Sequence, residues 1–466
     1  MKEFDVIVIG AGSGLHISSA AAEQGLSVAI VEEGPMGGTC LNRGCIPSKM
    51  IIHSADVAET ISTSHLFGVI SKIQKIDFAR VTRRASAAVD KEAREIEESI
   101  RHAKNMELFK KRGRFVGERT IAVGSKKIRG RKVVVAAGTR PSVPLIEGLQ
   151  DIEYLTSDNA MRITKQPKSM IILGGGYIAA ELGHFFGALG TKVTILQRSV
   201  MLREEDREIA EAFTHAFSKK HKVVLGYTPK EAKKKSGGIY IIAENQKKRQ
   251  IKLSAESLLV ATGRVPNTDL LDVKKGGIAV NEKGFVKVNK FLETTAPGTW
   301  ALGDIVGKYL LKHSANLEAE YVWHNAFTKH KHPVDYWPMG HAIFTSPQIA
   351  AAGYTEQELQ EMKKDYAKGV YHYKDTGMGL AIAEENGFAK ILADRRSRKI
   401  LGCHIMGPEA PTLIHEAIIA MKCGLTADQL AGTVHIHPAA SEVVQRAAGS
   451  IDWGREAEQR FMGYKE

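Results

Sequence analysis

The feature that most constrains the fold is a pattern of strand, glycine turn, helix and strand that occurs twice. Its first copy begins with the apolar run Phe4 to Ile9 and ends with the run Val28 to Val31, which Glu32 follows. The glycines let a pyrophosphate approach the backbone, the helix start stabilises its charge, and the acid can bind a ribose hydroxyl. Leu15 replaces the third glycine of the usual pattern, so helix and strand are expected to pack less closely there. The glycines of the turn are Gly10, Gly12 and Gly14.

The second copy has the same order. The run Ile171 to Leu173 leads to a glycine turn, a helix as far as Leu189 and the run Val193 to Leu196. The turn contains Gly174 and Gly176, followed by an alanine in the place where alanine is an accepted third residue. Two such units predict an α/β chain with two Rossmann-like domains and two bound dinucleotides.

A cysteine pair lies shortly after the first unit. The segment Gly37 to Lys49 reads G-G-T-C-L-N-R-G-C-I-P-S-K and contains Cys40 and Cys45. In a regular helix, Cα atoms five residues apart are separated by roughly 8.7 Å, whereas a disulfide spans at most about 7 Å. A bond between the two sulfurs therefore requires an irregular first turn. Without its flanks, the spacing fits two buried thiols of an intracellular enzyme better than redox chemistry.

With its flanks, the segment resembles the redox-active region of the class I flavoprotein disulfide reductases, the family of dihydrolipoyl dehydrogenase and of glutathione, mycothione and mercuric reductases. The resemblance implies FAD in the first unit and a redox-active disulfide between Cys40 and Cys45. Cys45 is implied to lie next to the flavin and Cys40 to exchange with substrate. Lys49 and Glu181 are implied to pair and to place positive charge near the reactive flavin nitrogen.

Two later motifs extend the resemblance on the flavin side. Ala136 to Pro141 resembles the A-T-G-x-x-P segment where the chain leaves the flavin domain, and Trp300 to Asp304 resembles the second FAD signature. Asp304 is implied to bind the ribityl hydroxyls. Besides Lys49, Glu32 and the glycines of the first turn, FAD contacts are expected from Gly38, Thr39, Gly117, Gly138, Asp304, Leu311 and His313.

The second unit is implied to bind the nicotinamide coenzyme. Gln197 corresponds to Glu32 of the first unit, so the acid that would bind an NAD ribose and repel a 2′-phosphate is absent. Arg198 and Arg203 follow, and guanidinium groups pair with phosphate. We therefore expect NADP, with NAD as the alternative if both arginines are ordinary solvated residues. Other expected contacts are Gly174, Gly176, Tyr177, Ile178, Glu181 and Gly263, Tyr177 being either an aromatic gate or a core residue.

The last part of the chain lacks a glycine fingerprint and resembles the family's interface domain. Its segment Val434 to Glu442 matches the pattern H-P-x-x-S-E. An imidazole oriented by a carboxylate suits thiol chemistry at neutral pH. By resemblance, His437 is the acid–base residue, Glu442 orients it, and the pair completes the active site of the other subunit in a homodimer. His435 is the weaker candidate.

The motifs divide the chain into four expected parts. Short alternating runs between Glu107 and Ala136 predict a strand meander, and the periodicity of Asp77 to Ala103 predicts a solvated helix. The parts are 1–145, the first part of the FAD-binding domain; 146–264, the NAD(P)-binding domain; 265–336, the second part of the FAD-binding domain; and 337–466, a C-terminal α+β dimerisation domain.

Composition excludes several other classes of protein. With 466 residues, 43% hydrophobic and 25% charged, the chain should form several domains with sizeable cores. Four cysteines in this length argue against a secreted disulfide framework. No apolar run approaches the ~20 residues of a membrane span. A strand at Phe4 leaves no room for a signal peptide, so a cytoplasmic protein is expected.

The formal charge of +13 comes from scattered lysines without a nucleic-acid motif. No nucleic-acid function is therefore expected, and the charge favours anionic substrates or an acidic partner. The histidines at 330, 332 and 341 have no acid or cysteine partner at ligand spacing, so they are expected to be solvated and no metal site is expected.

The substrate is less constrained than the reaction class. Tyr154 to Asn159 and Tyr309 to Asn316 look closest to the dihydrolipoyl dehydrogenase and mycothione reductase branches. We expect dihydrolipoyl dehydrogenase-type activity, which would make a 2-oxoacid dehydrogenase complex a candidate partner. The alternative is NADPH-dependent reduction of a low-molecular-weight thiol disulfide, such as that of mycothiol or glutathione, which Arg198 and Arg203 favour. A third, remote hypothesis is that the chain is a non-catalytic flavoprotein subunit.

Overall fold

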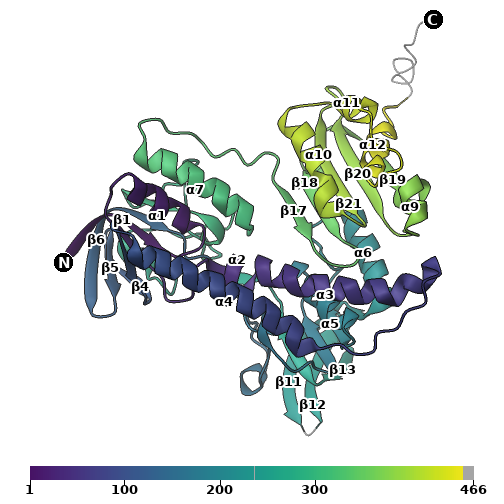
Figure 1. The fold of residues 1–466 in the computed structure, drawn as a ribbon, viewed down its shortest axis with the longest axis horizontal. Coiled ribbons are helices and arrows are strands. Elements are labelled where there is room, and N and C mark those ends of the chain that lie inside the picture. The colour runs from purple at the N-terminus through teal and green to yellow at the C-terminus, as the bar shows by residue number, and fades with distance from the viewer. Residues whose placement is uncertain (236, 455–466) are drawn as a thin grey trace, which may run out of the picture.

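The computed structural model describes residues 1–235 and 237–454 (Figure 1). Residues 455–466 of the expected C-terminal domain lie outside the described part. Three main sheets organise the chain, the first from its N-terminal part, the second from its middle and the third from its C-terminal part. The long helices α3 (Cys45–Thr63) and α4 (Phe78–His102) run across the molecule, α3 below the C-terminal part and α4 below α7 (Lys312–Phe327) (Figure 1).

The first sheet has the strand order β3-β2-β1-β6-β5-β4, and β16 also pairs with β6. Its central strand β1 is apolar on both faces because α1 (Gly14–Glu23) and α7 (Lys312–Phe327) cover one face and the remaining core covers the other. The strands are β1 (Lys2–Ile9), β2 (Val28–Val31), β3 (Met106–Phe109), β4 (Gly113–Gly117), β5 (Thr120–Val123), β6 (Lys126–Val135) and β16 (Thr299–Ala301).

The expected meander is only partly correct. Strands β4, β5 and β6 form an antiparallel meander, but β3 pairs in parallel with β2 at the opposite edge of the sheet. The short apolar run of β3 has the same pattern whether its neighbour is parallel or antiparallel, because pairing depends on the route of the chain through α4. Helix α4 lies where the periodicity predicted it, and the Asp77 side chain caps it by accepting a hydrogen bond from Arg80 N (3.0 Å).

The second sheet is parallel, with the order β10-β9-β8-β14. An antiparallel sheet of β11, β12 and β13 adjoins it. Helices α5 (Tyr177–Ala188) and α6 (Arg207–Lys220) belong to this part. The strands are β8 (Ser169–Leu173), β9 (Lys192–Gln197), β10 (Lys222–Leu225), β11 (Tyr227–Lys235), β12 (Gly238–Asn245), β13 (Gln250–Ala255) and β14 (Ser257–Val260).

The two crossing motifs lie side by side. Strand β7 (Thr139–Pro141) pairs with β15 (Arg264–Pro266) in antiparallel orientation, with Arg140 opposite Val265. The chain therefore leaves the first sheet and returns to it through one two-stranded connection. This explains why β16, far along the sequence, extends the sheet formed by the first residues.

The third sheet is antiparallel, with the order β17-β18-β21-β20-β19. The sequence of its strands contains no dinucleotide-binding glycine pattern. Its strands are β17 (Gly340–Ile343), β18 (Ile349–Gly353), β19 (Tyr366–His372), β20 (Phe388–Asp394) and β21 (Ile400–Met406). The helices of this part are α8 (Glu356–Glu361), α9 (Gly377–Ala381), α10 (Ala410–Lys422), α11 (Ala427–Gly432) and α12 (Glu442–Gly449).

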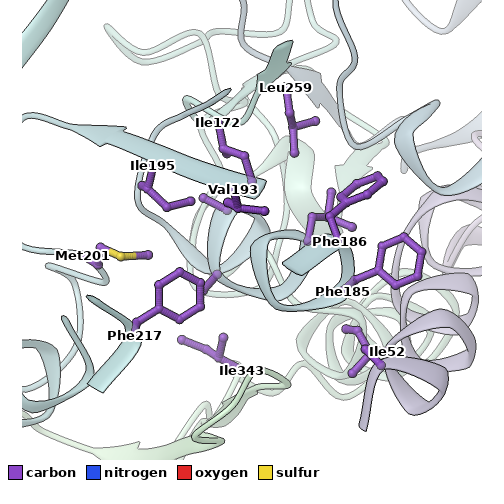
Figure 2. Packing of buried hydrophobic residues seen from close by; sticks show 14 of the residues in the cluster. Ile52, Ile172, Phe185, Phe186, Val193, Ile195, Met201, Phe217, Leu259 and Ile343 are labelled. Atoms are coloured by element: carbon purple, nitrogen blue, oxygen red, sulfur yellow. The ribbon is translucent and has the colours of Figure 1, made fainter. Parts of the chain in front are cut away.

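One apolar cluster joins all three parts. Ile52 of α3, Phe185 and Phe186 of α5 and Ile343 of β17 belong to it, together with residues of β8 and β9 (Figure 2). The rings of Phe185 and Phe186 lie 4.8 Å apart and both contact Phe78 at the start of α4. This core holds α3 against α5, which places the cysteine-bearing end of α3 beside the second dinucleotide unit.

Within the described residues, none of the helices is both long and apolar enough to cross a membrane. The same residues contain no group of three or more histidine, cysteine or acidic side chains placed to hold a metal ion.

Candidate functional site

The two cysteines lie on either side of a break between helices. Helix α2 (Gly38–Arg43) contains Cys40 and ends at Gly44, and α3 begins at Cys45. Gly44 has φ −140° and ψ −120°, which no helical residue adopts, and a Cβ there would lie 2.9 Å from the Thr39 carbonyl oxygen. This is the irregular turn that the spacing of the pair requires.

In this structure the two sulfurs are thiols that share a hydrogen bond. That bond, donated by Cys40, lowers the pKa of Cys45 to about 7, and the nearby Lys49 ammonium acts in the same direction. The same bond and burial raise the pKa of Cys40. Cys45 is also the first residue of α3, where the positive end of the helix favours a thiolate. Cys45 is therefore the more acidic thiol of the pair.

Lys49 and Glu181 connect the two dinucleotide units. The Lys49 Nζ donates to Glu181 Oε1 at 2.9 Å and to Oε2 at 3.0 Å, and lies 4.4 Å from the centre of the Phe344 ring. The Phe344 backbone N–H also donates to Glu181 Oε1 (3.0 Å). Glu181 is nearly fully buried, so its orientation is set from two sides. The pairing implied by the family resemblance is present in the geometry.

A cavity of about 1330 Å³ begins at the first glycine turn and passes the cysteine pair to β17 and α10. It exceeds the ~300–1,000 Å³ of common ligand pockets, as a bound dinucleotide requires. Most of the expected site residues line it: Gly10, Gly12, Glu32, Gly38, Thr39, Cys40, Cys45, Lys49, Gly138, Tyr177, Ile178, Glu181, Asp304, Leu311 and His313.

Polar groups in this cavity fit FAD. The Glu32 carboxylate accepts backbone N–H groups from Ala11 (2.9 Å) and Gly34 (2.7 Å), which fixes it in the cavity wall with lone pairs left for a ribose. Asp304 accepts from the Thr139 hydroxyl (3.0 Å), and burial raises the pKa of its carboxyl. The buried hydroxyl of Ser157, a cavity residue, has no partner within the described chain. A bound group rich in hydroxyls and phosphates would satisfy it.

Five of the expected glycines do not line the cavity, namely Gly14, Gly117 and Gly263 and, in the second unit, Gly174 and Gly176. Gly117 ends β4 in the turn toward β5, and Gly113 at the start of that strand lines the cavity instead. Gly263 precedes Arg264, which lines it. Gly14 lies at the start of α1, where a Cβ would come within 2.7 Å of the Val8 side chain. Close helix–strand contact is thus provided at Gly14, and the looser packing expected from Leu15 is not observed.

The remaining coenzyme-side residues lie outside the large cavity. Gly174 and Gly176 lie between β8 and α5, and a Cβ on Gly175 would lie 2.8 Å from the Gln197 side chain. The Gln197 amide oxygen accepts from Arg198 N (3.0 Å). Arg203 is exposed and pairs with Glu204 (2.8 Å). Both arginines therefore follow the second fingerprint, but neither lines the large cavity.

His437 and Glu442 form a pair on the surface of the C-terminal part. His437 Nδ1 lies 3.0 Å from Glu442 Oε1, and this hydrogen bond lowers the pKa of the Glu442 carboxyl. The imidazole is 70% exposed, whereas Glu442 is 5% exposed. Helix α12, which begins at Glu442, is remote from α2 in the same chain (Figure 1). Within one chain the pair does not meet the cysteines.

His435 differs from His437 in its surroundings. Its Nε2 lies 3.0 Å from Glu416 Oε2, and its side chain is 9% exposed. Burial raises the pKa of Glu416. The buried imidazole of His435 therefore serves the packing of its own subunit, while the imidazole of His437 remains accessible.

The sequence missed several residues of the cavity. His341 was expected to be solvated without an acid partner, yet its Nε2 lies 2.8 Å from Glu205 Oε1, and this carboxylate raises the pKa of His341 against the effect of burial. Glu205 lies far away in sequence, so no local spacing could indicate it. Lys312 also lines the cavity and follows the expected Leu311 directly. Ser13, within the first glycine turn, is a third such residue.

Comparison with known proteins agrees with this geometry. Residues 4–326 match the pyridine nucleotide-disulphide oxidoreductase family, and residues 339–448 match the dimerisation domain of that family. A mycothione reductase of Mycobacterium tuberculosis is 37% identical over 462 residues, covering 96% of this chain and 99% of the relative. A dihydrolipoyl dehydrogenase of Cupriavidus necator is 33% identical, covering 97% of this chain and 98% of the relative.

A solved structure has the same fold. The HOCl-induced flavoprotein disulfide reductase RclA of Escherichia coli superposes with a TM-score of 0.85 at 25% identity, covering 96% of this chain and 99% of the other. The two family models together match residues 4–326 and 339–448, and each of these relatives is matched along nearly its whole length. This chain belongs to the pyridine nucleotide-disulphide oxidoreductases, flavoprotein enzymes that use FAD and NAD(P)H and act on sulfur groups.

Proposed function

We propose that the chain is an NADPH-linked reductase of a low-molecular-weight thiol disulfide of the mycothione type and works as a homodimer. The observation that carries the reaction class is the position of Cys40 and Cys45 in the wall of the large cavity, with the Lys49–Glu181 pair behind them. The choice of disulfide is supported by the 37% identity with a mycothione reductase along nearly the whole of both chains.

NADPH is supported by the end of the second unit. Gln197 places a neutral amide where an acid would repel a 2′-phosphate, and Arg198 and Arg203 lie just beyond it. The ion pair of Arg203 with Glu204 is exposed on both sides and is therefore weak enough for a phosphate to compete. The basic net charge of +13 acts in the same direction for an anionic coenzyme.

In this proposal the reduced cysteines carry out the exchange with substrate. The Cys40 thiolate attacks one sulfur of the external disulfide, that S–S bond breaks, and a mixed disulfide forms while the first substrate thiolate leaves. The Cys45 thiolate then attacks the Cys40 sulfur, releases the second substrate thiolate and closes the Cys40–Cys45 disulfide. Two electrons pass to the substrate, and each leaving thiolate takes up one proton.

His437 is proposed to supply those protons. Its Nδ1 is held by Glu442, so its Nε2 points away from that carboxylate and is free to give a proton to a leaving thiolate. Because the imidazole is exposed and remote from its own cysteines, the proposal places it at the cysteines of a second subunit. Helix α10 and its neighbours belong to the matched dimerisation domain, which supports that arrangement.

FAD would be held by the first glycine turn, Glu32, Thr39, Asp304 and the backbone around Leu311. When bound, it supplies the two-electron link between NADPH and the sulfur pair. Two side chains of the protein would support this electron transfer. Lys49, paired with Glu181, contributes positive charge, and Cys45, with its lowered pKa, supplies a thiolate.

A panel of substrates tests the proposal. The purified holoenzyme is assayed with NADPH and with NADH against mycothione disulfide, glutathione disulfide and lipoamide, and in the reverse direction with dihydrolipoamide and NAD⁺. The highest kcat/KM is expected for NADPH with mycothione disulfide. A higher value for dihydrolipoamide with NAD⁺ would replace this function by dihydrolipoyl dehydrogenase activity, and would make association with a 2-oxoacid dehydrogenase complex the next question.

A further inference from the structure

A lysine with no assigned role lies in the same cavity as the thiols. Lys312 is the first residue of α7, is half-buried, and lines the cavity together with Cys40 and Cys45. Its Nζ donates to the Ser13 hydroxyl (2.9 Å), which in turn donates to Asn316 Oδ1 (2.9 Å). Asn316 is one turn further along α7, so this helix holds the Ser13 hydroxyl, and the hydroxyl in turn holds the ammonium.

The hydrogen bond to Ser13 places the ammonium beside the cysteine helix. Ser13 follows Gly12, and a Cβ on Gly38 would lie 2.7 Å from the Gly12 Cα. The first glycine turn is therefore in direct contact with the start of α2, in which Cys40 is the third residue. The amino end of α7, with its partial positive charge, reaches the same region.

Lys312 is also the less compensated of the two lysines near the sulfurs. Lys49 is neutralised by Glu181 at 2.9 Å. Among the described residues, no carboxylate pairs with Lys312, and the charges that act on it are those of Cys40 and Cys45. Burial lowers the pKa of Lys312, and the two thiols oppose that shift. The net positive charge facing the cysteines on this side of the cavity thus comes from Lys312 and the helix end.

We propose that Lys312 is a positioning residue for the exchange reaction: held by Ser13, its ammonium stabilises the thiolate of Cys40, the sulfur that attacks the substrate disulfide. Naming Cys40 as the attacking thiol rests on the proposed function. Lys49 lowers the pKa of Cys45, whereas the ammonium that lowers the pKa of Cys40 is that of Lys312. The hydrogen bond that stabilises the Cys45 thiolate raises the pKa of Cys40, so a second cation is needed when Cys40 itself is the nucleophile.

The role of Lys312 is therefore confined to one sulfur and one stage. When Cys40 loses its proton, negative charge forms on its sulfur near Lys312, and this charge passes to the first leaving thiolate as Cys40 attacks. When Cys45 later attacks the mixed disulfide, charge passes from the Cys45 sulfur to the second substrate thiolate, and the Cys40 sulfur carries none. A cation that does not bond covalently and does not transfer a proton is sufficient for this one stage, and no further reactant is consumed.

The test measures the acidity of Cys40 without any substrate or coenzyme. In holoenzyme carrying Cys45→Ser, the rate of alkylation of Cys40 by iodoacetamide is followed against pH. Lys312→Met is expected to raise the midpoint by at least about one pH unit, as when an opposite charge within ~4–6 Å is removed. Lys312→Arg is expected to retain the midpoint. Ser13→Ala, which only frees the ammonium, is expected to give a smaller shift in the same direction.

Two comparisons make the result specific. Lys308→Met removes an exposed lysine four residues earlier and is expected to leave the midpoint unchanged. Among the described residues, the charged or titratable groups that shift the pKa of Cys40 are Cys45 and Lys312, and Arg43, Lys49 and Glu181 line the same cavity. The series is repeated with His437→Gln, because the proposed dimer brings that imidazole to Cys40.

An unchanged midpoint in Lys312→Met, or an equal shift in Lys308→Met, would overturn the role of Lys312. If Lys312→Met does not retain FAD, the midpoint measured for Ser13→Ala decides instead. An unchanged midpoint in Ser13→Ala would then reject the proposal. Because no disulfide substrate is used, a wrong choice of substrate leaves this result unaffected. Conversely, a result that rejects the role of Lys312 does not affect the conclusion drawn from the substrate panel.

Discussion

Lys390 and Asp206 are both fully buried, and the Lys390 Nζ donates to Asp206 Oδ1 at 2.9 Å across the boundary between β20 and the start of α6. Glu356 completes the site by accepting from the same ammonium at 2.5 Å. The Asp206 carboxylate also accepts the backbone N–H groups of Glu208 (3.1 Å) and Glu356 (3.0 Å). These contacts join the coenzyme-binding part to the C-terminal part, next to the loop that carries Arg203.

Replacing Lys390 with methionine is expected to destabilise the protein strongly. The change leaves the Asp206 carboxylate buried without its ammonium, which typically costs about 3–5 kcal/mol in the free energy of unfolding. Urea denaturation followed by circular dichroism measures the loss. The half-exposed Lys368, which pairs with Glu208 and Glu356, is the matched control, and Lys368→Met should cost at most about 1 kcal/mol. Equal effects of the two substitutions would contradict this account.

The core shown in Figure 2 gives a second prediction on stability. Phe185 is fully buried between α3 and α5, so Phe185→Ala should lower the free energy of unfolding by about 3–5 kcal/mol. Since this core holds α3 against α5, NADPH oxidation should also fall. Leu66, 63% exposed beyond the end of α3, is the control, and Leu66→Ala should change stability by less than about 0.5 kcal/mol. A tolerant Phe185→Ala variant would show that α3 is positioned by other contacts.

The acidity of Cys45 predicts that the long-wavelength absorbance of the reduced enzyme depends on pH. A pKa of about 7, lowered mainly by the hydrogen bond from Cys40, means that the thiolate forms as pH rises through 7 and is lost as pH falls below it. The long-wavelength absorbance of anaerobically reduced holoenzyme, titrated from pH 5 to 9, should have its midpoint near pH 7. Cys40→Ala removes the hydrogen-bond donor and should move the midpoint upward, toward the ~8.5 of a free cysteine. A midpoint that stays in place would reject the role of Cys40.

Removal of the exposed imidazole should affect only the exchange with substrate. His437→Gln is expected to slow disulfide reduction by about 10²–10⁴-fold, the usual contribution of general acid–base catalysis. Reduction of the bound flavin by NADPH, followed by stopped-flow absorbance, should keep its rate. His435→Gln is the matched control, since that histidine also pairs with a glutamate but is buried. Equal losses in the two variants would argue for a structural role of the whole segment.

The basic end of the second unit predicts the choice of coenzyme. The double variant Arg198→Ala and Arg203→Ala should lower kcat/KM for NADPH by about 10–100-fold, as expected when hydrogen bonds to a charged group are lost. The value for NADH should be nearly unchanged, because NADH has no 2′-phosphate. Lys192→Ala, at the exposed start of β9, controls for the loss of positive charge. A parallel loss with both coenzymes would mean that the arginines do not recognise the phosphate.

Several parts of the molecule could be predicted because they depend on local chemistry. The glycine units, the helix after Asp77 and the break between Cys40 and Cys45 follow from backbone sterics, apolar periodicity and the reach of a disulfide, all of which act over a few residues. The Glu32 carboxylate likewise accepts a hydrogen bond from the glycine turn at Ala11 N, and His437 and Glu442 of the H-P-x-x-S-E segment are hydrogen-bonded to each other. The short strand β3 shows the limit of this reasoning, since its pattern is correct but its neighbour in the sheet was not predicted.

The amino-acid sequence by itself thus determined the two dinucleotide units, the cysteine pair and the class of chemistry, because each is written in adjacent residues. Only the tertiary structure decided which groups surround the sulfurs and the cavity. Lys312 beside Ser13, Glu205 beside His341 and Asp206 beside Lys390 are separated by long stretches of chain. Their pairing depends on how three sheets and the helices between them are assembled, and no local spacing encodes the distance between charges brought together in that way.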